Sequence, residues 1–371
     1  RIHAGSVDWG SLTRQESDAE PHCFSHWGTP RVYSGHACYS TRTGEETHRI
    51  IRDCLERSPG TLEMGEVKGP RYCTSIEERV ARFPEKESHP VFLEPVGRES
   101  VEIYMQNFTT GLPLDAQLKM VRSLPGCGKA RIMRPGYGIE YDFIPPTQLE
   151  PWLEVKAIRG LFCAGQVNGT SGYEEAAAQG ILAGINAALS IRGEEPLVIE
   201  RSRGYLGVLV DDLVTRGTDE PYRMLTSRCE YRLLLRHDNA DRRLAPVARR
   251  LGLLDDGRWK VLKARWAALD GEIDRLKNTR IRDAGLVETV LGGHDSGSSQ
   301  PGVTAAELLK RPGVTWEMVA RAAPPPEPLG REITERAQVE IKYEGYVARQ
   351  LSQVERMKRM ELVRVPEGLD Y

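Results

Sequence analysis

One segment constrains the fold of this chain more than any other, the unit from Leu161 to Leu189. Apolar residues at Ile158–Ala164 predict a short strand, Gly165–Gly172 (GQVNGTSG) predicts a tight turn, and an alanine-rich helix follows from about Tyr173. Glycines let a backbone turn sharply and approach a ligand, and a helix N-terminus favours phosphate. The unit therefore indicates either a nucleotide cradle or a plain α/β turn, and its spacing alone does not choose between them.

The predicted helix carries a face of small residues. Ala176, Gly180, Gly184 and Ala188 recur at steps of four, so they share one side of the helix. Small side chains on one side let a helix approach a neighbouring surface closely. We expect this face to pack against a sheet or a flat cofactor.

The rest of the chain separates into an α/β part and a helical part. Residues 1–68 read as irregular and polar, with one helical stretch at Glu45–Arg57. Apolar periodicity then predicts strands at Pro90–Glu94 and Val101–Tyr104, and helices at Pro113–Leu124, 256–277, Ala305–Lys310, Thr315–Arg321 and Arg336–Met360, while Leu206–Val214 reads as helix or strand. In 256–277 the apolar stripe is Trp259, Leu262, Trp266, Leu269, Ile273 and Leu276, which predicts helix packing in a bundle.

Size and composition set broad limits. A chain of 371 residues with 40% hydrophobic and 28% charged residues is ordinary globular material for two or three domains. The formal net charge of -2 excludes a polycation, so any nucleic-acid site must be a local patch. No apolar run reaches membrane-spanning length, and seven scattered cysteines favour free thiols in the cytoplasm.

An arginine-rich segment at 221–250 is the best candidate for such a patch. It holds eight arginines, no lysine and three acids (Glu230, Asp238 and Asp241), with Tyr222 and Tyr231 interleaved. Arginine binds phosphate bidentately and stacks on bases, which suits contact with RNA. The alternative is a salt-bridged helix surface that also uses Asp211 and Asp212. We expect RNA contact from part of the cluster.

A metal site is not predicted. Histidines and cysteines do cluster in the first part of the chain, but their spacing fits no zinc-finger pattern. The residues concerned are Cys23, His26, His36, Cys38, His48 and Cys54.

Ordered motifs identify a family. Residues 161–180 (LFCAGQVNGTSGYEEAAAQG) closely resemble the C-terminal flavin-binding motif of the MnmG family, also called GidA. Further motifs match in order at Gly69–Glu77, with Thr74 where the family usually has proline, Phe92–Pro95, Arg134–Asp142, Glu220–Arg232 and Lys342–Tyr346. The resemblance runs from about Val7 to Tyr371 and is weakest at 278–335.

The resemblance implies a fold and a domain order. It implies an α/β, FAD-binding, Rossmann-like core of the glutathione-reductase type, incomplete at its N-terminus because no G-x-G-x-x-G motif is present. The implied parts are the remainder of an inserted NAD-binding domain at 1–68, the C-terminal part of the FAD-binding domain at 69–200, a tRNA-contact segment at 201–253 and an incomplete helical C-terminal domain at 254–371.

The resemblance also implies an activity. MnmG-like proteins add carboxymethylaminomethyl or aminomethyl groups at C5 of the tRNA wobble uridine. They use FAD, NADH and methylenetetrahydrofolate, act together with the GTPase MnmE and form homodimers. Two alternatives remain: a folate- and FAD-dependent tRNA uridine methyltransferase of the TrmFO type, and a non-catalytic RNA-binding fragment. The chain begins at Arg1, and we expect a longer parent protein.

Site residues follow from the same motifs. Cys73 matches a cysteine that the family needs for activity. A nearby cation or helix N-terminus would lower its pKa and favour nucleophilic thiolate. The cofactor residues are Gly69, Pro70, Arg71, Tyr72, Ser75, Ile76 and Glu77 for NAD, and Gly165, Gln166, Gly169, Thr170, Gly172 and Tyr173 for flavin. The nucleic-acid residues are Arg223, Arg228, Arg232 and Arg236.

Overall fold

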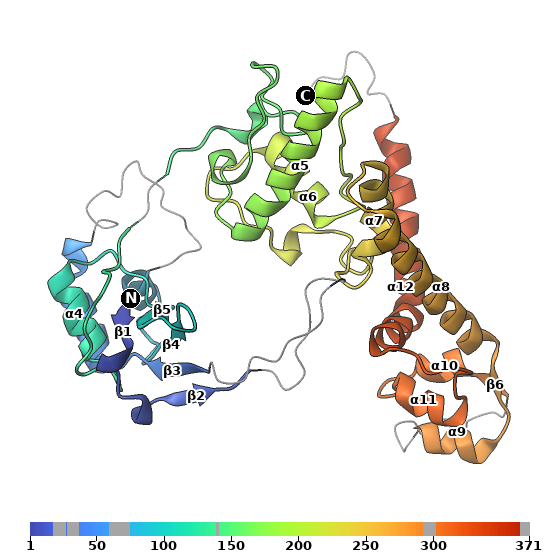
Figure 1. Cartoon of the computed structure of the whole chain (residues 1–371), viewed down its shortest axis with the longest axis horizontal. Helices are drawn as coiled ribbons and strands as arrows, with labels where there is room; N and C mark the ends of the chain where they lie inside the picture. The colour runs from blue at the N-terminus through green and yellow to red at the C-terminus, as the bar shows by residue number, and fades with distance from the viewer. Residues whose placement is uncertain (18–26, 28–36, 59–74, 139–140, 292–301, 364–371) are drawn as a thin grey trace. The chain divides into compact units, whose positions relative to one another are not determined.

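The computed structural model describes residues 1–17, 27, 37–58, 75–138, 141–291 and 302–363, coloured in Figure 1. The chain divides into two compact units. The first comprises residues 1–148, 163–180 and 217–223, and the second comprises 149–162, 181–216 and 224–371.

A five-stranded antiparallel sheet organises the first unit. Its order is β1 (Ile2–His3), β5 (Glu102–Gln106), β4 (Pro90–Pro95), β3 (Cys38–Arg42) and β2 (Thr13–Gln15). The strands predicted at Pro90–Glu94 and Val101–Tyr104 are confirmed as β4 and β5, whose alternate residues face the core. Strands β1, β2 and β3 lie where we expected irregular chain. That expectation was wrong because their partners are distant in sequence, as in the pairing of Tyr39 with Leu93.

Three helices complete the core of this unit. They are α1 (Glu45–Asp53), α3 (Ile76–Arg82) and α4 (Leu114–Arg122), and α1 packs against both of the others. Ile51, Ile76 and Met120 are fully buried among them. The sheet includes strands from both sides of residue 68, and the domain boundary there stays a prediction.

The strand predicted at Ile158–Ala164 is absent, and that prediction was wrong. Only a single bridge forms here, between Glu154 and Phe162. Gly160 has φ +83°, which interrupts an extended backbone, and Leu161 is 42% exposed. The turn and the helix after it are confirmed, the helix as α5 (Tyr173–Arg192). The small-residue face is not packed as expected, since a Cβ on Gly180 or Gly184 would meet no atom within 4 Å.

The second unit is mainly helical. Its helices are α6 (Tyr205–Asp211), α7 (Ala240–Arg250), α8 (Asp256–Asn278), α9 (Ala284–Leu291), α10 (Ala305–Leu309), α11 (Trp316–Ala322) and α12 (Arg331–Glu361). A π-helical turn (Asp212–Arg216) follows α6. Two short strands, β6 (Arg280–Ile281) and β7 (Val303–Thr304), pair with each other in antiparallel orientation.

Helices α8 and α12 pack against each other side by side. Helices α9, α10 and α11 are gathered at one end of this pair (Figure 1). The predicted stripe of α8 is confirmed, with Leu262, Leu269 and Leu276 buried. Helix α12 begins five residues earlier than predicted. Its buried residues include Ala337, Ile341 and Val354, whereas Tyr343 and Tyr346 are exposed.

Candidate functional site

The glycine turn is a 3-10 helix over Gly165–Asn168 that ends at a left-handed glycine. Gly165 has φ +80° and Gly169 has φ +79°, a region that side chains disfavour. A Cβ on Gly169 would lie 2.9 Å from Cγ2 of Thr218 and 3.2 Å from the ring of Phe143. Glycine is therefore required at position 169 for both backbone conformation and space.

The side chain of Gln179 holds the glycine turn in place through hydrogen bonds. This residue of α5 is fully buried. Its Oε1 accepts hydrogen bonds from Gly165 N (3.2 Å) and Asn168 Nδ2 (2.8 Å), and its Nε2 donates to Thr170 Oγ1 (3.0 Å). Sequence reasoning gave Asn168 and Gln179 no role. The signal available was a glutamine in line with Glu175 and Asn186 on the buried side of a helix, where polar groups need partners.

Residues 217–223 brace the other side of the turn. Tyr222 N donates to Gly169 O (2.8 Å), and Thr170 forms a parallel bridge with Tyr222. Arg223 Nε donates to Oε1 of the buried Glu175 at 3.1 Å. Arg223, which we predicted as a tRNA contact, thus lies at the glycine turn.

The turn fits one edge of a nucleotide cofactor. Asn168 Oδ1 and Ser171 Oγ are buried and have no hydrogen-bond partner among the described residues, which is costly unless a ligand or water supplies one. In contrast, Gln166 and Tyr173 are exposed, and space is open around Gly180. Hydrogen bonding thus fixes the inner side of the turn, while its outer side and the small-residue face of α5 are accessible.

Only part of the predicted NAD segment lies among the described residues. Gly69, Pro70, Arg71, Tyr72 and the predicted catalytic Cys73 lie outside them. Ser75 caps α3 by accepting a bond from Glu78 N, and Ile76 is in the core. Glu77 is buried, and its Oε1 accepts a bond from Gly111 N (2.8 Å). Its Oε2 is buried and has no hydrogen-bond partner within the part of the chain that the structure describes.

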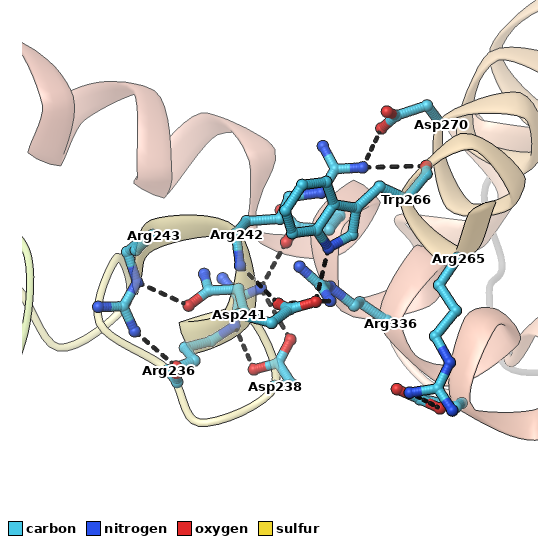
Figure 2. A network of polar contacts seen from close by, with 12 residues as sticks. Arg236, Asp238, Asp241, Arg242, Arg243, Arg265, Trp266, Asp270 and Arg336 are labelled. Atoms are coloured by element: carbon cyan, nitrogen blue, oxygen red, sulfur yellow. Dashed lines mark hydrogen bonds and ion pairs between the residues drawn. The ribbon is translucent and has the colours of Figure 1, made fainter. Parts of the chain in front are cut away.

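The arginine-rich segment is a dense polar network where it meets α8 and α12 (Figure 2). Arg236 is 13% exposed and pairs with Asp238 (2.9 Å) and Glu340 (2.7 Å). These contacts raise the pKa of Arg236, although burial acts in the opposite direction. Arg242 pairs with Asp270 at 2.6 Å. For Arg236 this geometry favours the salt-bridged alternative.

Arg228 and Arg232 are the remaining candidate arginines of this segment. Arg228 ends the short 3-10 helix Thr226–Arg228 and is half-buried. Arg232 is exposed. Of the four predicted nucleic-acid residues, Arg232 is therefore the one classed as exposed.

Arg201 is a charged centre that sequence reasoning missed. It pairs with Asp211 (2.8 Å), Asp212 (2.7 Å) and Glu230 (2.8 Å). The hydrogen bond from Arg201 lowers the pKa of Glu230. Asp211, Asp212 and Glu230, three of the acids that we weighed as partners for residues 221–250, thus pair with an arginine outside that segment. Arg201 also lines a pocket of about 250 Å³, together with Tyr231 and Met357.

The described residues also bear on the predictions about thiols, metal ligands and membrane spans. Their cysteines are free thiols, namely Cys38, Cys54, Cys127, Cys163 and Cys229. Within the described ranges no three histidine, cysteine or acidic side chains are grouped to hold a metal ion. Cys23, His26 and His36 lie outside those ranges. No described helix has the length and hydropathy needed to cross a bilayer.

The fold and the braced glycine turn together define a nucleotide-binding α/β protein with a helical C-terminal domain. The chain belongs to the family described as glucose inhibited division protein A, whose model matches residues 1–195. A second model, described as the tRNA modifying enzyme MnmG/GidA C-terminal helical domain, matches residues 256–351.

Relatives agree over the whole chain. The tRNA uridine 5-carboxymethylaminomethyl modification enzymes MnmG of Geobacillus thermodenitrificans and Exiguobacterium sibiricum are 47% and 49% identical over 371 residues. The chain spans 59% of the length of each of them. Aquifex aeolicus GidA, in its form II crystal, superposes with a TM-score of 0.85 at 38% identity, covering 100% of this chain and 58% of that one.

These comparisons confirm the predicted family and the predicted fold class, an FAD-binding α/β core with a helical C-terminal domain. They favour the MnmG interpretation over a TrmFO-type methyltransferase and over a non-catalytic fragment, since the relatives named MnmG match along the entire chain.

Proposed function

We propose that the protein containing this chain modifies the wobble uridine of tRNA, adding carboxymethylaminomethyl or aminomethyl groups at C5. The observation that carries the proposal is the glycine turn fixed by Gln179, in a chain whose relatives are named tRNA uridine 5-carboxymethylaminomethyl modification enzymes. The geometry of the turn supports a nucleotide-binding site, and the names of the relatives support tRNA uridine as the substrate.

The turn has the main cofactor role in this proposal. Gly165, Gly169 and Gly172 keep the backbone close to bound FAD, Thr170 is oriented by Gln179, and Gln166 and Tyr173 reach the cofactor from the exposed side. Ser75 and Glu77, with the segment from Gly69, bind NADH. When bound, FAD and NADH supply the redox steps, and methylenetetrahydrofolate supplies the one-carbon unit.

The remaining roles concern the substrate and the partners. Cys73 acts on the uracil ring as nucleophile or proton donor, and Arg228 and Arg232 contact tRNA phosphates. Arg223 orders the turn through its ion pair with Glu175. Arg236 stabilises the tRNA-contact segment through its ion pair with Glu340. We propose a cytoplasmic homodimer that acts with a GTPase of the MnmE type.

The cofactor proposal is tested by titrating the purified chain with FAD and following flavin fluorescence. Gly169→Ala should weaken binding at least tenfold, because the added Cβ meets Thr218 and Phe143 and disfavours φ +79°. Gly271→Ala is the matched control, since a Cβ there meets nothing within 4 Å. Equal FAD affinity in the two variants would contradict the proposed site.

The substrate proposal needs a separate measurement. Mass spectrometry of tRNA nucleosides, in cells whose only copy of the parent protein carries Gly169→Ala, should show less modified wobble uridine. The Gly271→Ala strain should show the normal amount. An unchanged nucleoside profile in the first strain, with FAD binding lost, would contradict the role of FAD in this modification.

A further inference from the structure

The C-terminal half of α12 has an exposed face that none of the assignments above uses. With 3.6 residues per turn, five of its residues fall within a sector of about 80°. All five are exposed, and they are Tyr346, Arg349, Gln353, Arg356 and Met360. The acids of this stretch, Glu355 and Glu361, lie on other sides of the helix. The face therefore combines two cations, an aromatic ring and no carboxylate.

The two arginines of this face are Arg349 and Arg356, and neither forms an ion pair with a described residue of the folded unit. In contrast, Arg236 and Arg336 are both paired with acids. Arg349 and Arg356 are two helical turns apart, a rise of about 10 Å along the axis. Two unpaired guanidinium groups in a row on an acid-free face match a chain of phosphates and repel other cations.

The aromatic ring adds a second kind of contact. Tyr346 is 56% exposed, and its ring centroid lies 6.2 Å from that of Tyr343. RNA-binding proteins use exposed aromatic rings beside arginines to stack unpaired bases, because every base offers a flat face.

The helix is held beside the arginine-rich segment. Gln350 Oε1 accepts a hydrogen bond from Leu234 N at 2.9 Å, and Val354 packs in one cluster with Cys229, Tyr231 and Leu235. The exposed Arg232 belongs to the same stretch of chain as these contacts. The helix that carries this face thus packs against the stretch of chain that contains Arg232, which is proposed above to contact tRNA.

We propose that this face of α12 binds RNA, with phosphates at Arg349 and Arg356 and an unpaired base stacked on Tyr346. The inference rests on the proposed function in tRNA modification, and it identifies a second contact surface for the same substrate. The arginine-rich segment and α12 then hold the substrate from two adjoining elements.

The test measures tRNA affinity of the purified chain by fluorescence anisotropy over a range of salt concentrations. Arg349→Glu/Arg356→Glu should weaken binding at least tenfold and lower the slope of log affinity against log salt by about 2, or about 1 per phosphate contact. The control Lys260→Glu/Lys263→Glu makes the same charge change at exposed positions on α8 and should have a much smaller effect. All of these positions are exposed, so thermal melting should match the native chain.

Tyr346 separates stacking from charge. Tyr346→Phe keeps the ring and should bind tRNA as the native chain does, whereas Tyr346→Ala should weaken binding about fivefold or more. An unchanged affinity and salt slope in the arginine double variant would overturn the inference while native tRNA binding upholds the proposed function. Equal losses in the arginine and lysine variants, or loss of a protein partner's binding with tRNA affinity unchanged, would also overturn it.

Discussion

Asp241 and Arg336 form a buried ion pair that joins the arginine-rich segment to α12. Arg336 Nη1 lies 3.0 Å from Asp241 Oδ1, and the two side chains are 7% and 6% exposed. Trp266 Nε1 of α8 also donates to the Asp241 carboxylate, at 2.6 Å (Figure 2). One carboxylate therefore connects three elements of the helical unit, and its loss should affect all of them.

Asp241→Asn should lower the free energy of unfolding by about 3–5 kcal/mol, because it leaves the charge of Arg336 buried without a counter-ion. Urea unfolding of the purified chain measures the change. Asp241→Asn/Arg336→Met should recover much of the loss, since the double change removes both charges and keeps an acceptor for Trp266. No recovery in the double variant would mean that charge pairing is not the cause. Asp53→Asn, in an exposed pair with Arg49, is the control and should have little effect.

Arg232 and Arg236 should separate RNA contact from structural support. Arg236→Ala breaks contacts to Asp238 and Glu340 and should lower the free energy of unfolding by about 3 kcal/mol. Arg232→Ala should leave unfolding almost unchanged and lower the salt slope of tRNA binding by about 1. The two measurements together decide the roles. Strong destabilisation by Arg232→Ala, or none by Arg236→Ala, would reverse our assignment.

Gln179→Leu should disorganise the glycine turn. The change removes the acceptor for Gly165 N and the donor to Thr170, and each buried polar group left unpaired costs about 1–3 kcal/mol. We expect a lower unfolding free energy and FAD affinity reduced at least tenfold, measured by urea unfolding and flavin fluorescence. Gln15→Leu, at an exposed position of β2, controls for the loss of an amide. Native FAD affinity in Gln179→Leu would show that the turn does not need this network.

The stability of the first unit should fall as pH falls through the histidine range. The rings of His48 and His89 are buried with centroids 5.4 Å apart. Burial lowers the pKa of both, with Arg52 adding to the effect on His48, and His48, Arg79, Lys86 and Arg42 adding to that on His89. The unfolded chain therefore binds more protons, so stability is present above the ordinary histidine pKa of 6.5 and is lost below it.

Urea midpoints measured between about pH 8 and about pH 5.5 should show this loss, a range that spans the titration of an ordinary histidine. His89→Gln should flatten the dependence, because one of the two rings no longer titrates. His237→Gln, at an exposed position, should leave the pH profile unchanged. A native profile that is flat over this range would contradict the prediction.

Cys73→Ser should abolish tRNA modification by the parent protein while FAD binding persists, because a hydroxyl is a far weaker nucleophile than a thiolate. Mass spectrometry of wobble nucleosides and flavin fluorescence measure the two properties. Cys38→Ser is the control, since burial and Glu94 raise the pKa of Cys38 and make thiolate scarce there. Normal levels of modified nucleoside in the Cys73→Ser protein would refute a catalytic role for Cys73.

The sequence predicted most helices well, for a physical reason. A helix repeats every 3.6 residues, so the stripe of Leu262, Leu269 and Leu276 records both the helix and its buried side. Strands are less local. Cys38–Arg42 is polar and became β3 only because β4 lies beside it, whereas Ile158–Ala164 is apolar and found only a bridge. A strand needs hydrogen-bond partners that its own residues do not specify.

The candidate site divides in the same way. The sequence by itself determined the family, the glycine turn at 165–172 and the presence of many arginines, because these are properties of residue order. Only the tertiary structure decided that Gln179 holds the turn and that Arg223 and Arg236 are paired with acids, whereas Arg349 and Arg356 have no ion pair with any described residue. Pairing of charges depends on which side chains meet across elements distant in the chain, and that is settled when the elements pack.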